Sequence, residues 1–164
     1  MEIVQFVRGL RVVPVTKWGH AESMRQIRNT CRAGFAHDRE KIGRRDQRAW
    51  WGSNRGRLVG MLYYAGDRPV GYGLLRQTED GRWWSSVAVL PQYGGNGYGR
   101  AITQHIIRQS PDGVVWAEAR KDQPAACALH RTDDWEVVGE DDERWHYRTR
   151  PDIGERRPWL DGAE

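Results

Sequence analysis

The sequence predicts one mixed α/β domain with a largely antiparallel sheet and about four helices. Three observations favour this class. Strand-like and helical segments alternate along the chain. Three strand-like segments before residue 90 follow one another through short turns, which is typical of antiparallel pairing. The length of 164 residues fits a single domain. We expect this domain to span residues 1–150 and residues 151–164 to form a loosely held tail, with Trp159 as its candidate docking residue.

The first part of the chain is expected to contain one or two strands and two helices. Leu10–Thr16 alternates as a strand, and Ile3–Val7 extends or precedes it. The segments His20–Gly34 and Arg44–Trp51 are predicted helices. A polar stretch around His37–Lys41 joins them.

The middle of the chain is predicted to be a run of strands. Leu58–Ala65 and Pro69–Arg76 form a hairpin whose turn is supplied by Gly66 and Asp67. After a second turn, Trp83–Leu90 is the next strand, and it ends at Pro91.

The last part of the chain is predicted to return to alternating helices and strands. A glycine-rich turn leads into a helix that runs to about Ser110 and places Tyr98, Ile102 and Ile106 on one face. The remaining elements are a strand, a short helix and a closing hairpin, at Val114–Arg120, Pro124–Arg131, Trp135–Gly139 and Glu143–Arg150. The sheet is thus expected to have six to seven strands.

Positive charge is concentrated in one segment. The chain carries a formal charge of +4, but residues 25–57 hold ten Arg and Lys against three Asp and Glu, which is +7 and leaves −3 for the rest. Such asymmetry indicates an anionic partner, and it is equally consistent with a solvated helical face.

Composition argues against several other classes of protein. No stretch is apolar enough for a membrane span, and Met1 is not followed by a signal-peptide pattern. Cys31 and Cys127 are too few for a disulfide scaffold and lack the spacing of metal ligands. We therefore expect a cytoplasmic protein without a metal or membrane partner.

The segment most informative about function is the glycine turn between Gln92 and Arg100. A strand runs into four glycines within six residues and then directly into a helix. Glycines allow close approach of the backbone, and a helix N-terminus presents unpaired N–H groups, so a diphosphate is the natural ligand. No Lys-Ser or Lys-Thr follows, which argues against a nucleoside triphosphate loop. The late position, behind antiparallel strands, argues against a dinucleotide fold and favours coenzyme A.

These residues resemble the acetyl-CoA signature of the GNAT superfamily. In that signature Val-x-Pro is followed by two residues of any type, then by Gln or Arg, and then by x-x-Gly-x-Gly or Ala. Counted from Pro91, Gly97 and Gly99 match, while Gly94 stands where Gln or Arg is usual. A later stretch resembles a second motif of the family, with Gln123 in place of Asn and His130 in place of Tyr. The two motifs occur in order within residues 58–148.

The resemblance implies a GNAT-type mixed sheet that splays apart at an acyl-CoA site. Coenzyme A would pair with the strand ending at Val89 and place its diphosphate on the turn. The residues expected to bind it are Val87, Ala88, Val89, Gly95, Asn96, Gly97, Tyr98, Gly99, Arg100 and Gln123. The amide near Val89 would stabilise the oxyanion of the transition state.

The resemblance also implies candidate catalytic residues for attack of an amine on the thioester. Glu118 is the candidate general base, or alternatively a partner of Arg120 or Arg76 in a structural ion pair. His130 is the candidate acid for the departing thiolate, with its free pKa near ~6.5, or alternatively a packed residue.

Several acceptors remain open at this stage. The Glu118-x-Arg120 pattern most resembles N-terminal acetyltransferases of ribosomal proteins. Ile27-Arg28-Asn29 with Trp50-Trp51 is faintly similar to enzymes acting on nucleotide-linked amino sugars. The predicted function is acetyl transfer to a primary amine by a monomer or homodimer. The alternatives are modification of a nucleic acid, such as a base or an aminoacyl-tRNA, and a non-catalytic acyl-CoA-binding module.

Overall fold

A computed structural model describes residues 4–37 and 39–151 of the chain. Its eight strands form one sheet in the order β1-β2-β3-β4-β5-β6-β8-β7. The strands are β1 (Gln5–Val7), β2 (Leu10–Pro14), β3 (Leu58–Ala65), β4 (Arg68–Gln77), β5 (Trp83–Val89), β6 (Trp116–Arg120), β7 (Trp135–Glu140) and β8 (Arg144–Thr149). The α-helices are α1 (Trp18–Cys31), α2 (Arg44–Asn54), α3 (Tyr98–Ile107) and α4 (Pro124–Leu129).

The predicted fold class is confirmed. Every neighbouring pair of strands is antiparallel except β5 and β6, which are parallel. The sheet has one strand more than the largest number expected, because the first strand-like region folds back at Arg8 and Gly9 into the hairpin β1–β2. The expected tail and Trp159 lie outside the described residues.

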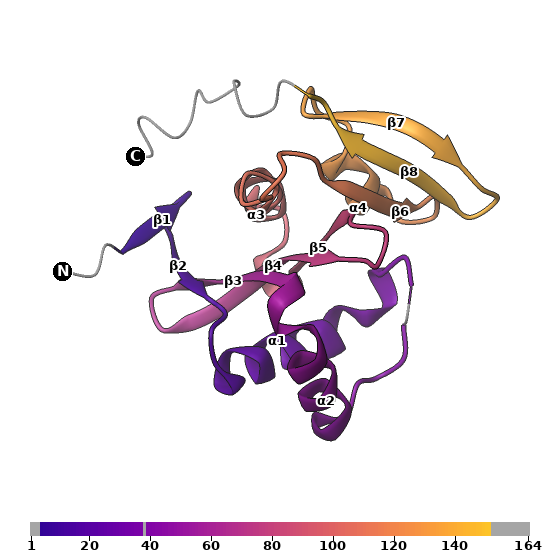
Figure 1. The fold of residues 1–164 in the computed structure, drawn as a ribbon. Helices are drawn as coiled ribbons and strands as arrows, with labels where there is room; N and C mark the ends of the chain where they lie inside the picture. Colours follow the sequence, from indigo (N-terminus) through magenta and orange to yellow (C-terminus); the bar gives the residue numbers. More distant parts are fainter. Residues whose placement is uncertain (1–3, 38, 152–164) are drawn as a thin grey trace.

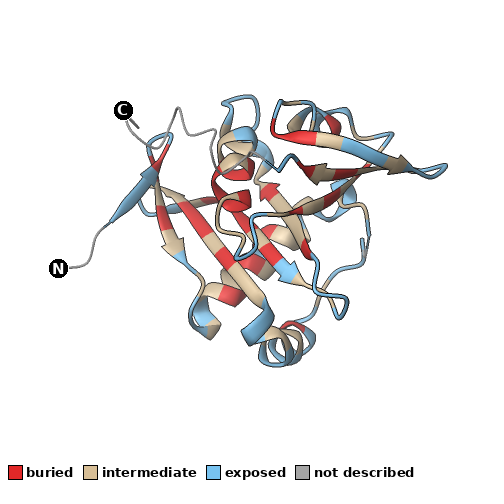
Figure 2. Cartoon of the chain, turned by 45° about the horizontal axis from the view of Figure 1, so that its top comes forward, coloured by how far each residue is buried: buried red, intermediate tan, exposed pale blue. Residues whose placement is uncertain are grey.

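The helices cover the two faces of the sheet (Figure 1). Met24 and Ile27 of α1 pack with Leu62, Tyr72 and Ala88 on one face. On the other face Ile102 of α3 packs against Tyr63 and Val70, and Ile106 packs against Leu75. Because side chains alternate along a strand, neighbours such as Leu62 and Tyr63 reach opposite cores. Figure 2 shows the buried residues following the central strands and the inner sides of these helices.

The C-terminal half is arranged around β6. Helix α4 follows β6 and contacts it, while β8 and β7 extend the sheet beyond it. Ala117, Ala119, Cys127 and Tyr147 form a core between these elements. Alternation along β6 leaves Glu118 on the face opposite these alanines. In the described part of the chain, no helix has the length and apolarity that a membrane crossing requires.

Candidate active site

The sheet opens between β5 and β6. The register of this parallel pair contains one position, Trp84 opposite Trp116, so the strands separate beyond it. The amide of Leu90 donates to the Val70 carbonyl of β4 at 2.8 Å. Since backbone groups alternate in direction along a strand, Val87 and Val89 turn theirs toward the open side, and Ala88 turns its own toward β4. An extended ligand can therefore pair with Val87 and Val89.

The glycine turn lies at the end of β5 and leads into α3. Gly95 and Gly97 have φ of 79° and 76°, a left-handed conformation that favours glycine. Gly97 is the N-cap of α3, and among the described residues no side chain caps this helix. The N–H groups of its first turn, from Tyr98 to Arg100, are those that have no partner inside a helix.

Gly99 brings the turn close to α4. A Cβ atom built at Gly99 would lie 3.2 Å from Cδ2 of Leu129 and 3.8 Å from Cγ2 of Val89. The end of β5, the start of α3 and helix α4 thus meet at one place. This is the arrangement that a diphosphate and the chain attached to it would need.

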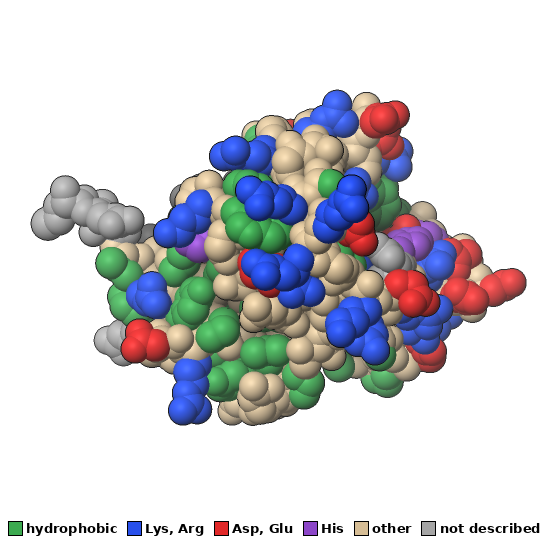
Figure 3. All heavy atoms as spheres, turned by 90° about the horizontal axis from the view of Figure 1, so that it is seen from below, with side chains coloured by type: hydrophobic (Ala, Val, Ile, Leu, Met, Phe, Trp, Pro, Cys, Tyr) green, Lys and Arg blue, Asp and Glu red, His purple; other side chains and the backbone are tan. Residues whose placement is uncertain are grey.

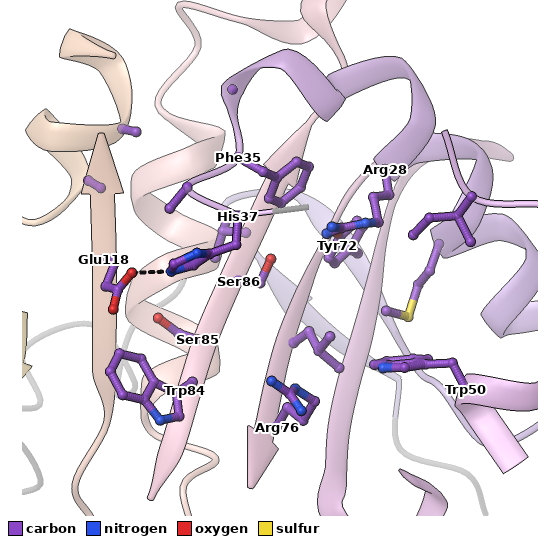
Figure 4. A pocket seen from close by; sticks show the side chains of 18 of the residues that line it. Arg28, Phe35, His37, Trp50, Tyr72, Arg76, Trp84, Ser85, Ser86 and Glu118 are labelled. Atoms are coloured by element: carbon purple, nitrogen blue, oxygen red, sulfur yellow. Dashed lines mark hydrogen bonds and ion pairs between the residues drawn. The ribbon is translucent and has the colours of Figure 1, made fainter. Parts of the chain in front are cut away.

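A cavity of about 980 Å³ passes through the opening between β5 and β6. One end lies between α1, α2 and β4, with Arg28, Trp50 and Arg76 in its wall. The other end reaches Leu129 and His130 at α4. Figure 4 shows Glu118 and His37 pointing toward each other within it, with Trp84, Ser85 and Ser86 along β5.

Glu118 stands between two histidines. Nε2 of His37 contacts Oε2 of Glu118, and Nδ1 of His146 lies 3.3 Å from Oε1. The carboxylate is mostly buried, with 16% of its side chain exposed. Its partners are therefore these imidazoles, and the sequence-based alternative of an ion pair with Arg120 or Arg76 is wrong within the described residues: Arg120 pairs with Asp122.

The contacts of Glu118 continue through His146 to the surface. Nε2 of His146 lies 3.2 Å from Oδ2 of Asp141, whose side chain is 43% exposed. Hydrogen bonds from the amides of Glu143 and Arg144 and the charge of Arg144 hold the pKa of Asp141 below its ordinary value. Asp141 is thus a carboxylate at neutral pH. It is the solvent-exposed end of the row of contacts that runs from Glu118 through His146.

The loop that carries His37 is fixed to the sheet by two arginines. Nη1 of Arg120 donates to the Ala33 carbonyl at 2.9 Å, and Nε of Arg144 donates to the Ala36 carbonyl at 3.2 Å. Farther along, Asn29 bonds both the amide and the carbonyl of Ile42. His37 therefore reaches Glu118 from an anchored loop.

His130 is packed rather than open. Its ring stacks on Tyr147 at 4.8 Å and meets Trp135 edge-on at 4.7 Å. Burial lowers its pKa to about 4. Nδ1 lies 2.9 Å from the Ala126 carbonyl, which can only accept, so Nδ1 carries the proton and Nε2 is an acceptor. The expectation that an imidazolium is available here at neutral pH is corrected by this burial.

The wall opposite Glu118 combines aromatic rings and guanidinium groups. Arg28 lies over the ring of Phe35, 4.4 Å from its centroid. Tyr72 is buried, and burial raises the pKa of its hydroxyl, which stays protonated. Arg76 and Trp50 face the cavity from β4 and α2 (Figure 4). Within the described residues no ion pair holds Arg76.

The positive segment forms the outer face over α1 and α2, where Lys and Arg side chains are spread (Figure 3). Several are engaged locally: Arg25 pairs with Glu22 at 2.7 Å, and Arg55 lies over the ring of Trp51 at 4.5 Å. Arg48 likewise covers Trp18 at 5.7 Å. These arginines lie over Trp51 and Trp18, whereas Trp50 faces the cavity.

The predicted site residues fall into two groups. Val87, Val89 and the turn from Gly95 to Arg100 lie together beside the opening. Gln123 is farther toward the loop, its Oε1 3.7 Å from a Cβ atom built at Gly34. Sequence reasoning missed three residues near Glu118, namely His37, His146 and Asp141. No local motif marks them, because the loop and the β6–β8 register bring them there.

Comparison with known proteins agrees with this geometry. The model of a family described as the acetyltransferase (GNAT) family matches residues 21–133. The N-alpha-acetyltransferase RimI of Mycobacterium tuberculosis is 37% identical over 54 residues, which cover 33% of this chain and 34% of RimI. That match thus spans about a third of the relative.

Three solved structures share the fold. The structure of yncA from Salmonella typhimurium, with its cofactor acetyl-CoA, has a TM-score of 0.71 at 16% identity and covers 87% of this chain and 94% of its own. RimL, a ribosomal L7/L12 alpha-N-protein acetyltransferase in complex with coenzyme A, has a TM-score of 0.68 at 14% identity, and the match covers 90% of this chain and 97% of RimL. FdhC, a nucleotide-linked sugar GNAT, has a TM-score of 0.73 at 13% identity, and the match covers 98% of this chain and 97% of FdhC.

Proposed function

This chain belongs to the acetyltransferase (GNAT) family, and on that premise we propose that it acetylates the primary amine of a small acceptor that also carries an anionic group. One observation carries the proposal: the opening beside Val87 and Val89 leads into the cavity that holds Glu118. Acyl donor and acceptor can therefore meet where a carboxylate is in place.

The residues present fit coenzyme A. Gly97 has φ of 76° and begins a helix that no described side chain caps, so first-turn amides are available for a diphosphate. Gly95–Arg100 would hold the diphosphate, and the backbone of Val87 and Val89 would hold the pantetheine arm. When bound, acetyl-CoA supplies a thioester whose carbonyl carbon accepts the amine as the sulfur departs with its electron pair.

Glu118 is the proposed general base. An alkylammonium must lose a proton before its nitrogen can attack, and a nearby carboxylate can take that proton directly or through one water. The amide of Val89, directed to the open side, would donate to the developing oxyanion. His130 is proposed to position the cofactor through Nε2, because its neutral ring carries its one proton on Nδ1.

His146 would return Glu118 to its ionised form. With the proton of neutral His146 on Nε2, facing Asp141, the lone pair of Nδ1 faces Glu118 and can accept the proton that Glu118 has taken up. The Nε2 proton then passes to water at the surface beside Asp141, whose carboxylate stays ionised.

The acceptor is proposed from the opposite wall. Arg76 faces the cavity without an ion-pair partner among the described residues, and Arg28 adds a second guanidinium. Guanidinium groups bind carboxylate and phosphate groups in a planar, two-pronged geometry. An acceptor such as an amino acid or an amino sugar phosphate would place its amine at Glu118 and its anionic group at Arg76.

A protein N-terminus is the second candidate, supported by the local similarity to RimI. One experiment separates the two. Acetyl-CoA consumption would be followed with amino acids, nucleotide-linked amino sugars and short peptides, and with Arg76→Gln beside the wild type. The proposal is supported if the wild type acetylates small anionic amines and Arg76→Gln lowers kcat/KM for them, mainly by raising KM. Turnover of peptides alone, or no effect of Arg76→Gln, would refute the assigned acceptor class.

A further inference from the structure

Arg8 adopts a backbone conformation that its residue type disfavours. It occupies the two-residue turn between β1 and β2 with φ of 47°, followed by Gly9 with φ of 76°. Both values are positive, as in the type I′ hairpin turn, whose first position favours Asn, Asp or Gly. An ordinary L residue is strained there, because its Cβ atom comes too close to the backbone. Such an outlier suggests that the side chain has a role.

The topology brings this turn beside the glycine turn. Strands β1 to β5 are neighbours in order, and each neighbouring pair is antiparallel. The β1–β2 turn and the C-terminal end of β5 therefore lie at the same end of the strands. Nε of Arg8 donates to the carbonyl of Asn96 at 3.0 Å. The guanidinium also lies against Gly97, where a Cβ atom would be 3.1 Å from Cζ, Nε and Nη2.

The glycine turn carries a cationic side chain only at its last residue, Arg100. None of the residues from Gln92 to Gly99 is ionisable to a cation, and Gly94 contributes no side chain. The Nε contact of Arg8 leaves the two Nη groups as donors, and no described residue takes them. A guanidinium with these donors beside a helix N-terminus is suited to an anion with several oxygens.

We propose that Arg8 is a binding residue for the diphosphate of coenzyme A, and that it supplies from the N-terminal hairpin a cation beside Gly97, in addition to Arg100 at the end of the turn. The inference rests on the proposed function, since it assumes that this turn holds acyl-CoA. The contact is noncovalent, and Arg8 takes no part in the chemistry at Glu118.

The test uses Arg8→Asn, which removes the cation and places the preferred Asn-Gly pair in the turn. The fold is therefore kept, and its Tm stays equal or rises. Calorimetry on the full chain should show the Kd for coenzyme A rising roughly 10- to 100-fold, the loss expected for charge-assisted hydrogen bonds. Arg11→Ala is the matched control, since Arg11 lies three residues on in β2 and stacks over Tyr64 at 4.9 Å; its Kd should stay unchanged.

Analogues of coenzyme A that lack one or all of its phosphates show which phosphate Arg8 contacts. With 3′-dephospho-CoA the loss caused by Arg8→Asn should be as large as with coenzyme A, and with S-acetylpantetheine, which has no phosphate, kcat/KM should be unaffected. A loss that disappears with 3′-dephospho-CoA would overturn the proposal, because the contact would then be to the 3′-phosphate.

Two further outcomes decide the matter. If the wild type binds coenzyme A and Arg8→Asn binds it equally well, Arg8 is a structural residue and this inference alone fails. If the wild type binds no form of coenzyme A, the proposed function fails and takes the inference with it.

Discussion

Glu118 on β6 and His146 on β8 are register partners, and Nδ1 of His146 lies 3.3 Å from Oε1 of Glu118. Their backbone pairing places the two side chains beside each other on one face of the sheet. A carboxylate held in this way needs little reorganisation before it accepts a proton. The pair is therefore the reference point for tests of catalysis.

Glu118→Gln should reduce kcat roughly 10²- to 10⁴-fold, because the amide keeps the shape but cannot accept the amine proton. Steady-state kinetics at neutral pH measure it. Glu136→Gln is the matched control: Glu136 pairs with Arg148 at the next strands and does not line the cavity. Turnover of Glu118→Gln equal to that of Glu136→Gln would rule out the base.

His146→Phe should lower kcat about 3- to 30-fold and leave the Kd for acetyl-CoA unchanged, since it removes only the route from Glu118 to Asp141. The effect should be smaller than that of Glu118→Gln, because water can replace His146 as the group that takes the proton from Glu118. The sharper readout is the double variant. Residues that act as a unit are non-additive, so in the Glu118→Gln background His146→Phe should have no further effect. If the double variant instead shows the product of the two single effects, His146 does not act through Glu118.

His130→Phe tests whether that residue is an acid or a packing contact. Since burial lowers the pKa of His130 to about 4, it is neutral throughout the range from pH 6 to pH 8. Its replacement should alter the Kd for coenzyme A and leave the shape of the pH–kcat profile in that range unchanged. If His130→Phe instead removes a pH-dependent rise or fall of kcat between pH 6 and pH 8, His130 acts as the acid.

Gly97→Val should abolish detectable binding of coenzyme A, because a branched side chain at φ of 76° would both strain the turn and occupy the cradle. Gly113→Val controls for the strain. Gly113 has φ of 74°, and a Cβ atom there meets nothing within 4 Å. Both variants should lose about 1–2 kcal/mol of stability, but only Gly97→Val should lose the thermal shift by coenzyme A. Equal shifts would contradict the assigned cradle.

Local sequence signals predicted the elements better than the contacts between them. The bounds of β3 agree with the prediction, because alternation and the Gly66-Asp67 turn are both local. The helix expected to reach Ser110 ends at Ile107, since Ser110 and Asp112 instead bond Val114 to form a turn. Such side-chain competition is hard to place by periodicity alone.

The site shows the same division. The glycine turn was visible because its chemistry is contiguous in sequence. The surroundings of Glu118 were not, since His37 arrives on a loop fixed by Arg120 and His146 arrives by strand register. The packing around His130 was not visible for a related reason: the rings that bury it, Trp135 and Tyr147, come from β7 and β8.

Acid stability offers a test of the core that is independent of catalysis. His105 of α3 is buried, its Nδ1 lies 2.7 Å from the Tyr63 hydroxyl, and burial lowers its pKa to about 4 from an ordinary value of 6.5. Between these values the unfolded chain binds a proton that the folded chain does not. The contribution of His105 to stability is therefore complete above pH 6.5 and is lost as the pH falls toward 4.

The expected slope is about 1.4 kcal/mol per pH unit for each such group. His130 has a similarly lowered pKa, and the pKa of His20 is also lowered by burial, so His105 contributes one slope of several between pH 6 and pH 4.5. His105→Gln keeps a hydrogen-bonding side chain opposite Tyr63 but does not titrate in this range. Its free energy of unfolding, measured with urea at several pH values, should be lower at pH 7 and should fall less steeply than that of the wild type, by about 1.4 kcal/mol per pH unit. A variant that loses stability as steeply as the wild type would show that His105 is not the neutral, buried group that the packing of α3 on β3 requires.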